Sequence, residues 1–354
     1  MNCSPPLLSK SVAILTGPAT HLDHLGILSA LLEIPLIVTE ESTFQLAKHY
    51  YPQINATLME LSDLSMDYLC SHFDVLFESG KFWALELKPF MKLLHNKNMR
   101  FIFCPHGNSD KGHSLTHHPD QDISLVYGNH LYTHLEKTGA LVNTRATIAT
   151  GNYRYPFYRK FSTFYDELAD IEVFSHFTHS KPTILYAPTW HGKENPTSCF
   201  KATEKIISQL GNDYNLIIKF HPFLIEDFPG KILNLIHRYE KHPSVHFIEQ
   251  FPPIYPLLKR CDIYLGDYSS IGYDFLSFDK PLYFYRPRHS PSDLSACGIT
   301  IPDTQIDRLL SFFQETLTRA QSDFSAARKE LYAHTFGEEK QASELRAAIA
   351  TSLL

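Results

Sequence analysis

The sequence has no long apolar run, no paired cysteines and no excess of basic charge. No run approaches the roughly 18 apolar residues of a membrane-spanning helix. The six cysteines contain no CxxC pair, which favours a reducing cytoplasm over a disulfide framework or a zinc site. The net charge of −6 provides no overall basic field for nucleic acid, and residues 1–10 lack the pattern of a signal peptide. We therefore expect a cytoplasmic protein that binds no nucleic acid.

Several motifs of common enzyme classes are also missing. No GxxxxGK[ST] segment is present, which excludes a P-loop, and no GxSxG elbow marks a hydrolase. The first expected strand, residues 11–16, is followed by Gly17-Pro18-Ala19, where a dinucleotide site would have GxGxxG. His113, His117 and His118 match no standard ligand spacing, and no second cluster of Cys or carboxylates supports them, so we expect no metal site in this loop. No cofactor is expected elsewhere in the chain.

What the chain does contain is a regular alternation of short apolar strands and amphipathic helices. This alternation predicts an α/β protein with parallel sheets built from right-handed crossovers. The expected strands are residues 11–16, 34–39, 73–78, 100–104, 123–127, 147–150, 183–186, 216–220, 245–248 and 281–285, with one more from residue 262. The expected helices are residues 22–32, 83–95, 201–210, 232–240, 254–261 and 304–354.

The length of 354 residues favours two domains over one core. A polar, aromatic-rich region at 161–181 interrupts the alternation, and Pro182 closes it. We therefore predict two doubly wound, Rossmann-like domains that face a cleft, residues 1–170 and 171–330. A C-terminal helix at 331–354 is expected to pack back on the first domain.

The most informative segment is residues 262–274. An apolar run ends there at Gly266 and Asp267, and Ser269 and Ser270 then open a helical pattern. The free N–H groups of a helix's first turn attract anions, phosphate above all. Serine is also a common helix cap, so the pair alone is equally compatible with an ordinary strand-to-helix turn.

Four further candidate sites also follow expected strands. His106 is a candidate general base, although a lone histidine is more often structural. Arg154 is a candidate anion ligand or a member of an ion pair, and Thr189 is a candidate phosphate donor beside Trp190, a pocket wall or core residue. His221 is held in an extended conformation by the proline that follows it.

Taken in order, these segments resemble the CDP-glycerol glycerophosphotransferase family, whose members build teichoic-acid-type polymers. The resemblance covers roughly residues 100–290 and is strongest after residue 183. The matching residues are His106-Gly107 with Lys111, Gly151 with Arg154, Tyr186 to Trp190, His221-Pro222, Asp267 to Ser270 with Asp274, and Lys280-Pro281 with Phe284-Tyr285.

The chain departs from the family's pattern at several positions. Asn108, Ser109 and Asp110 replace the usual Thr-Pro-Leu, and Tyr153 replaces a proline. His191 stands where the family usually has arginine after the tryptophan. Gly272 stands where a larger residue is usual.

The resemblance implies a GT-B fold, with two Rossmann-like domains and the nucleotide donor mainly on the second. It implies transfer of a polyol phosphate from a CDP-linked donor to an acceptor hydroxyl of a polymer or glycan, with release of CMP. His106 would be the base, His221 and Thr189 would bind the transferred phosphate, and no metal would be needed. Contacts to the donor are expected from Asp267, Ser269, Ser270, Lys111 and Arg154, and further ones from Trp190, His191, Asp274 and Arg286.

Two other functions remain open at this stage. A glycosyltransferase of the same fold would use the same pyrophosphate site but break a bond at carbon. A non-catalytic nucleotide-binding relative is kept open by the departures at Asn108 and His191. Contact with the inner face of a membrane is expected from the resemblance alone.

Overall fold

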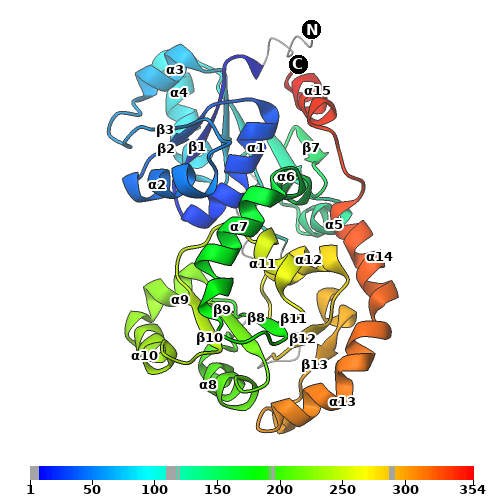
Figure 1. Cartoon of the computed structure of the whole chain (residues 1–354). Coiled ribbons are helices and arrows are strands. Elements are labelled where there is room, and N and C mark those ends of the chain that lie inside the picture. Colours follow the sequence, from blue (N-terminus) through cyan, green and yellow to red (C-terminus); the bar gives the residue numbers. More distant parts are fainter. Residues whose placement is uncertain (1–7, 109–117, 119, 191, 193–195, 287–291) are drawn as a thin grey trace. The chain divides into compact units, whose positions relative to one another are not determined.

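The computed structural model describes residues 8–108, 118, 120–190, 192, 196–286 and 292–354. The described chain forms two compact units (Figure 1). Unit 1 contains the described residues up to 157 together with residues 334–354, and unit 2 contains the described residues from 158 to 333. Among the described residues, no helix is both long and apolar enough to cross a membrane.

Unit 1 contains a seven-stranded, entirely parallel sheet with strand order β3-β2-β1-β4-β5-β6-β7. Its strands are β1 (Ser11–Leu15), β2 (Leu36–Val38), β3 (Ala56–Leu58), β4 (Val75–Glu78), β5 (Arg100–Phe103), β6 (Ile123–Val126) and β7 (Ala146–Ala149). Its helices are η2 (Ala19–Asp23), α1 (Leu25–Leu32), α2 (Glu41–Tyr50), α3 (Met66–His72), the π-helical turn η3 (Trp83–Leu87), α4 (Lys88–His95), α5 (Asn129–Lys137), α6 (Arg154–Lys160, which ends in unit 2) and α15 (Ala342–Leu353).

Unit 2 contains a six-stranded parallel sheet with strand order β10-β9-β8-β11-β12-β13. Its strands are β8 (Thr183–Ala187), β9 (Asn215–Lys219), β10 (Val245–Ile248), β11 (Ile263–Gly266), β12 (Leu282–Phe284) and β13 (Ile299–Thr300). Its helices are α7 (Ser162–Glu172), η5 (Phe174–His176), α8 (Cys199–Leu210), α9 (Pro222–Asp227), α10 (Pro229–Tyr239), α11 (Tyr255–Arg260), α12 (Ile271–Phe275), η6 (Leu276–Phe278), η7 (Leu294–Cys297), η8 (Asp303–Gln305), α13 (Leu309–Ser322) and α14 (Ser325–Phe336, which ends in unit 1).

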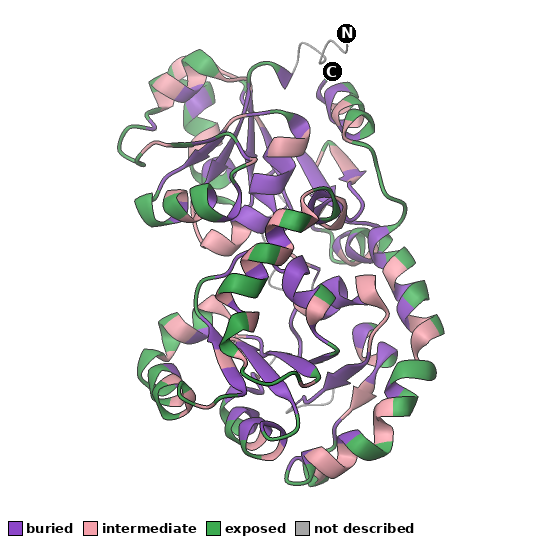
Figure 2. Cartoon of the chain, in the orientation of Figure 1, coloured by how far each residue is buried: buried purple, intermediate pink, exposed green. Residues whose placement is uncertain are grey.

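The predicted fold class, α/β with two parallel doubly wound sheets, is confirmed. In each sheet the chain winds outward on one side and then returns to the middle, so β1 lies beside β4 and β8 lies beside β11. Ligands of such sheets bind outside the carboxyl ends of the strands at this reversal. Every residue of β1 and β8 is buried, as expected of strands covered on both faces (Figure 2).

The C-terminal segment of unit 1 packs against the ends of its strands. Gly151 has a φ of +70°, and a Cβ at this position would lie 2.7 Å from the backbone oxygen of Glu338. Because a side chain has neither the room nor the backbone freedom here, only glycine lets this segment approach so closely. Arg346 of α15 forms an ion pair with Glu33 at the end of α1.

Several elements differ from the sequence-based expectations. The region at 161–181, to which the sequence assigned no element, contains α7, whose Tyr165 and Ala169 are buried. The single helix expected at 304–354 is divided into α13, α14 and α15. Gly337, the residue after α14, has a left-handed φ of +65°, which is typical of a helix end. The helix expected at 83–95 begins with the π-helical turn η3. The elements α2, β3, α3, α5, α6, α9 and β13 were also not expected.

Candidate functional site

In unit 2, the loops after β8 and β11 are joined through one buried carboxylate. Asp267 accepts hydrogen bonds from the backbone nitrogens of Thr189 and Ser198, both at 2.8 Å, and from the Ser198 hydroxyl, also at 2.8 Å. The backbone nitrogen of Tyr268 donates to it as well. Asp267 is only 1% exposed. A negative group with these donors around it fixes the two loops, and it would repel a phosphate rather than bind one.

Ser198, which donates to Asp267, is also hydrogen-bonded to Tyr186. The hydroxyl oxygens of Tyr186 and Ser198 lie 2.8 Å apart. Because the single proton of Ser198 goes to Asp267, the Tyr186 hydroxyl is the donor to Ser198. Burial raises the pKa of Tyr186, so its hydroxyl keeps its proton. The chain of hydrogen bonds therefore holds the start of α8 against the end of β8.

Ser269 and Ser270 lie at the start of α12, as the sequence predicts. The helix has only five residues and is continued by the 3₁₀ turn η6. Ser270 occupies the N-cap position, but among the described residues its hydroxyl makes no capping hydrogen bond. The hydroxyl is therefore not used to complete this helix, in contrast to an ordinary serine cap.

The structure explains the unusual glycine in this helix. A Cβ at Gly272 would lie 2.7 Å from Cδ2 of Leu294 and 3.2 Å from Cε1 of Tyr264. Tyr264 is completely buried beneath the segment that connects β11 and α12. The larger residue expected at position 272 from the sequence resemblance would therefore need smaller side chains in place of Tyr264 and Leu294.

Arg286 is part of the same arrangement, although its sequence position is equally compatible with a surface charge. It is 4% exposed, and its Nε donates to the backbone oxygen of Asp267 at 2.9 Å. Its Nη2 donates to Ser292 at 2.8 Å, and its guanidinium lies 4.7 Å from the centre of the Tyr268 ring. Arg286 thus brings a permanent positive charge to the carboxyl end of β11.

His221 lies between β9 and α9 and is the N-cap residue of α9. Its Nδ1 accepts a hydrogen bond from the backbone nitrogen of Phe223 at 3.2 Å. In the neutral ring the proton therefore lies on Nε2, which makes that nitrogen a donor. The rings of Trp190 and His221 both contact Phe223, with ring centres 6.2 and 5.3 Å away.

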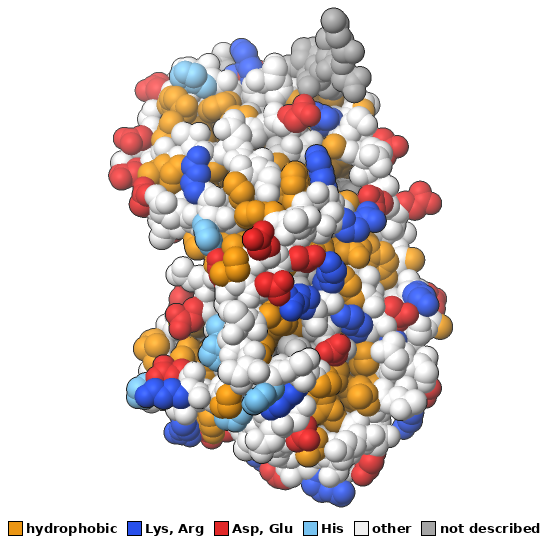
Figure 3. All heavy atoms as spheres, in the orientation of Figure 1, with side chains coloured by type: hydrophobic (Ala, Val, Ile, Leu, Met, Phe, Trp, Pro, Cys, Tyr) orange, Lys and Arg blue, Asp and Glu red, His pale blue; other side chains and the backbone are white. Residues whose placement is uncertain are grey.

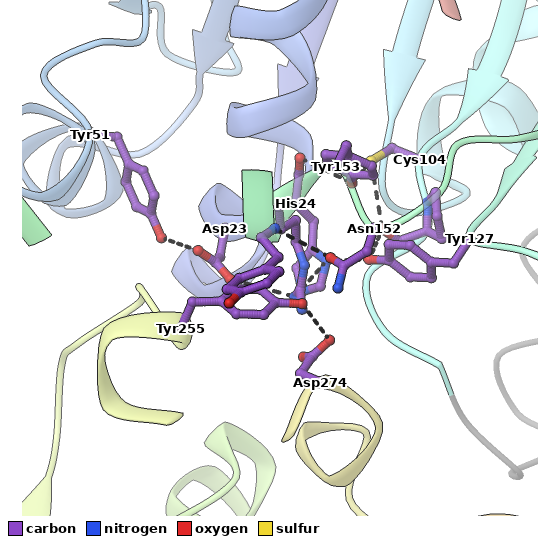
Figure 4. A network of polar contacts seen from close by, with 12 residues as sticks. Asp23, His24, Tyr51, Cys104, Tyr127, Asn152, Tyr153, Tyr255 and Asp274 are labelled. Carbon is purple, nitrogen blue, oxygen red and sulfur yellow. Dashed lines mark hydrogen bonds and ion pairs between the residues drawn. The ribbon is translucent and has the colours of Figure 1, made fainter. Parts of the chain in front are cut away.

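Asp274 has a defined partner within unit 2. Its Oδ1 accepts a hydrogen bond from the Tyr255 hydroxyl at 3.3 Å, and the residue is 7% exposed (Figure 4). This bond joins α12 to α11.

In unit 1, a buried polar cluster surrounds His24, which ends the turn η2 that follows β1 (Figure 4). Nδ1 of His24 lies 2.6 Å from the Tyr127 hydroxyl, and Nε2 lies 3.0 Å from Nη1 of Arg154. Arg154 also lies 3.5 Å from Asp23, which accepts a hydrogen bond from Tyr51 at 2.9 Å.

The protonation of His24 follows from these partners. Arginine only donates, so Nε2 of His24 must accept from Arg154. The Tyr127 hydroxyl donates to the backbone oxygen of Pro105 at 3.1 Å, so it accepts from Nδ1 of His24. Burial, and after it the charges of Arg154, His21 and His106, lower the pKa of His24 well below 6.5. His24 is therefore neutral.

His106 lies in the same unit, in the loop after β5. Its ring stacks on that of His21, with centres 4.4 Å apart and an interplanar angle of 21°. Nδ1 of His21 lies 2.8 Å from the Ser79 hydroxyl. The neighbouring Glu78 accepts hydrogen bonds from the backbone nitrogens of residues 83 and 84 and from Gln121, and burial raises its pKa to about 7.

The predicted site residues thus fall into two groups. His106 and Arg154 belong to unit 1; Thr189, Trp190, His221, Asp267, Ser269, Ser270, Asp274 and Arg286 belong to unit 2. Lys111 and His191 lie outside the described residues, as do Arg288, His113 and His117. Within the described part of the chain, no group of three or more His, Cys, Asp or Glu residues could hold a metal ion.

Sequence reasoning missed His21, Asp23, His24 and Glu78. The first three lie in or next to η2, which follows β1, and Glu78 is the last residue of β4; these are the two strands at the reversal of the first sheet. The available signal was this position: the loop after the first strand of a doubly wound sheet is a usual ligand site even without a glycine motif.

Comparison with known proteins links residues 125–290 to one family. This segment matches the profile of the CDP-glycerol:poly(glycerophosphate) glycerophosphotransferases. A teichoic acid glycerol-phosphate primase of Bacillus spizizenii is 31% identical over 108 residues, which is 30% of this chain and 25% of that protein. The match thus spans about a quarter of the length of that curated relative.

Solved structures resemble the chain over nearly its whole length. A complex of a variant of the wall teichoic acid polymerase TagF with CDPG aligns with a TM-score of 0.66 and 14% identity, covering 97% of this chain and 88% of that one. HepE of Anabaena, in complex with UDP and glucose, aligns with a TM-score of 0.56 and 9% identity, covering 97% and 99%. At these identities the likeness shows the fold, which is GT-B-like.

Proposed function

Because this chain belongs, through residues 125–290, to the CDP-glycerol:poly(glycerophosphate) glycerophosphotransferase family, we propose that it transfers a polyol phosphate of the glycerol phosphate type from a CDP-linked donor to an acceptor hydroxyl. The acceptor oxygen attacks the phosphorus that bears the polyol. The bond from that phosphorus to the CMP oxygen breaks, and CMP leaves. The product is a phosphodiester in a cell-surface polymer or glycan.

The observation that carries this proposal is the meeting of the matched segments at the reversal of the second sheet. Thr189 follows β8, and Ser269 and Ser270 follow the neighbouring strand β11. Asp267 accepts a hydrogen bond from the Thr189 backbone nitrogen and so joins the two loops. The Thr189 and serine hydroxyls are donors suited to a pyrophosphate, and Arg286 adds positive charge close to them. Asp267 then serves as a positioning residue.

The two histidines have complementary roles in this proposal. His221 donates from Nε2 to an oxygen of the transferred phosphate, since its Nδ1 is occupied by a backbone N–H. His106 takes the proton of the acceptor hydroxyl as general base. Phosphoryl transfer depends mainly on positioning and on neutralising the phosphate oxygens, and these side chains supply both without a metal.

The test is the identity of the released nucleotide. The purified chain is incubated with CDP-glycerol, CDP-ribitol or UDP-glucose and a glycerol phosphate oligomer, and released nucleotides are separated by chromatography. CMP from a CDP-polyol supports the proposal. Release of UDP from UDP-glucose, with no release of CMP, would instead support a glycosyltransferase. This alternative is kept because the HepE structure, which has a similar fold, contains UDP and glucose.

Matched variants test the assigned residues. His106→Ala is expected to keep donor affinity, measured by calorimetry, and to lose turnover. His221→Ala should lose turnover as well, whereas His237→Ala, an exposed histidine of α10, should behave as the parent chain. Donor binding by the parent chain without turnover on any acceptor would instead favour the non-catalytic relative.

We also propose that the chain works at the inner face of a membrane, through one surface of unit 1. Large apolar side chains are exposed along η3 and α4: Phe82 (45%), Leu85 (41%), Phe90 (50%), Leu93 (77%) and Leu94 (61%). Lys81 and Lys92 are exposed on the same segment. Hydrophobic side chains reach the surface over α3 and α4 in the face that Figure 3 shows. Apolar groups flanked by lysines fit the interface of an anionic bilayer.

A further inference from the structure

His21 has a fixed backbone position in the loop after β1. It lies in the 3₁₀ turn η2, where its nitrogen donates to the backbone oxygen of Pro18 at 2.9 Å. Its own backbone oxygen accepts from the nitrogen of His24 at 3.0 Å. Both the N–H and the C=O of His21 are therefore hydrogen-bonded within the turn, which fixes the position from which its side chain projects.

The ring of His21 is fixed as well. Nδ1 lies 2.8 Å from the hydroxyl of Ser79, a residue that is 2% exposed and directly follows β4. Since β4 pairs with β1 in register, with Ala13 opposite Phe77, the two ends of these strands arrive side by side. The hydrogen bond then sets the rotation of the His21 ring about its own axis.

His106 is flanked by two other rings. His21 stacks on it at 4.4 Å with an interplanar angle of 21°, and Phe103 approaches it edge to face at 6.0 Å and 72°. Phe103 is itself in contact with His118, whose Nδ1 lies 3.0 Å from the Ser124 hydroxyl. The ring of His106 thus has one neighbour in η2, the turn that follows β1, and one at the end of β5.

We propose that His21 is a positioning residue: by stacking, it holds the imidazole of His106 in one orientation, and Ser79 locks the His21 ring in turn. The aromatic face of His21 is what matters for this role, rather than its ability to carry a proton. The kinetic consequence rests on the proposed function, in which His106 is the base, whereas the positioning itself does not.

The kinetic test compares three replacements of His21. His21→Ala removes the ring, and a displaced general base should lower kcat about 100-fold while the KM for the donor changes little. His21→Gln keeps a polar group but no ring and should stay nearly as slow. His21→Phe restores a stacking ring and should recover most of the lost rate. The matched control is His72→Ala, because His72 also packs on an aromatic ring, that of Tyr68, at 4.4 Å but on α3.

A second measurement is independent of catalysis. Diethyl pyrocarbonate modifies accessible imidazoles, and mass spectrometry gives the modification rate of the peptide that contains His106. The rate should rise severalfold in His21→Ala and should stay at the parent value in His21→Phe and in the His72→Ala control, with the circular dichroism of all variants unchanged.

The inference is overturned if His21→Phe is as slow as His21→Ala, or if the modification rate of His106 is the same in His21→Ala and the parent chain. If the parent chain transfers nothing from any donor, the proposed function fails, and the modification rates still decide whether His21 positions His106.

Discussion

The carboxylate of Asp267 lies 2.8 Å from the backbone nitrogen of Thr189, although 78 residues separate them along the chain. The bond joins the carboxyl ends of β11 and β8, where the two strands diverge into the loops that carry the candidate phosphate donors. Asp262 makes a bond of the same kind at the opposite end of these strands, to the Thr183 nitrogen at 2.8 Å. Two aspartates thus tie the same pair of strands, one buried and one exposed.

Replacing Asp267 with asparagine should disturb both stability and donor binding. The amide would keep one acceptor, but its NH2 group would face the N–H and hydroxyl of Ser198. Leaving buried donors without an acceptor costs about 1–3 kcal/mol, so the free energy of unfolding should fall by about that amount. Denaturation with urea measures this change, and calorimetry with CDP-glycerol measures the loss of donor affinity.

Asp262→Asn is the matched control for this replacement. It makes the same replacement at the amino end, in an exposed position where the amide oxygen can still accept from the Thr183 nitrogen, and should leave donor affinity at the parent value. Equal donor affinity in Asp267→Asn and Asp262→Asn would contradict the role given to Asp267.

Removing the Ser270 hydroxyl should weaken donor binding without weakening the fold. The hydroxyl makes no capping bond among the described residues, so Ser270→Ala should leave the melting temperature unchanged. A hydrogen bond to a charged phosphate contributes about 1.5–3 kcal/mol, so the donor Kd should rise by at least about tenfold.

Ser65 provides the contrast. Its hydroxyl caps α3 by accepting from the Tyr68 nitrogen at 3.2 Å, so Ser65→Ala should cost about 1 kcal/mol of stability and leave the donor Kd unchanged. A lower melting temperature for Ser270→Ala, with an unchanged Kd, would reverse the assignment.

The sequence predicts most strands because these are buried on both faces and so stand out as apolar runs, whereas β3 and β13, which are partly exposed, were missed. The ends of β8 and β11 were predicted for the same reason, since Thr189 lies two residues after one such run and Asp267 directly after the other. The helix α7 was missed because only two of its residues, Tyr165 and Ala169, are buried, which leaves little apolar periodicity.

The cluster in unit 1 could not be predicted from local pattern. His24 becomes significant only when the ends of β6 and β7 bring Tyr127 and Arg154 to its ring. Likewise, the burial of Arg286 depends on the Asp267 backbone and Ser292, which the sequence does not place beside it. Such contacts arise from strand order, which no single segment encodes.

Glu78 should make unit 1 less stable as the pH rises. Burial raises its pKa from 4.5 to about 7, so the folded chain binds this proton more tightly than the unfolded chain. Its contribution to stability is therefore complete below pH 4.5 and is lost as the pH rises through about 7, by at most about 1.4 kcal/mol per pH unit. Glu78→Gln has no proton to lose, so its free energy of unfolding should decline less between pH 4.5 and 7 than that of the parent chain. Urea denaturation over this range checks the difference, and equal slopes would contradict it.

The titration of His24 should make unit 1 less stable as the pH falls, which is the opposite of the effect of Glu78. Its pKa is lowered from 6.5 in the folded chain, so the unfolded chain binds the proton more tightly. The contribution of neutral His24 to the free energy of unfolding is then complete above pH 6.5 and is lost as the pH falls below 6.5. His24→Gln should remove this loss, so its stability relative to the parent chain should improve as the pH falls from 7 to 5. His49→Gln, on the exposed side of α2, should follow the parent curve.

A charge placed on α4 should abolish binding to anionic vesicles. Leu93 is 77% exposed and Leu94 is 61% exposed, so neither contributes much to the core, and glutamate at either position should leave the fold intact. At a bilayer the same replacement buries a charge and repels anionic headgroups, so the bound fraction in sedimentation with phosphatidylglycerol vesicles should fall to background. Val142→Glu is the control, because Val142 is 82% exposed in unit 1 but outside η3 and α4, and it should bind as the parent chain does. If Leu93→Glu still sediments with the vesicles, this surface is not the membrane contact; if it instead turns a dimer into a monomer in light scattering, the apolar surface serves a second copy of the chain.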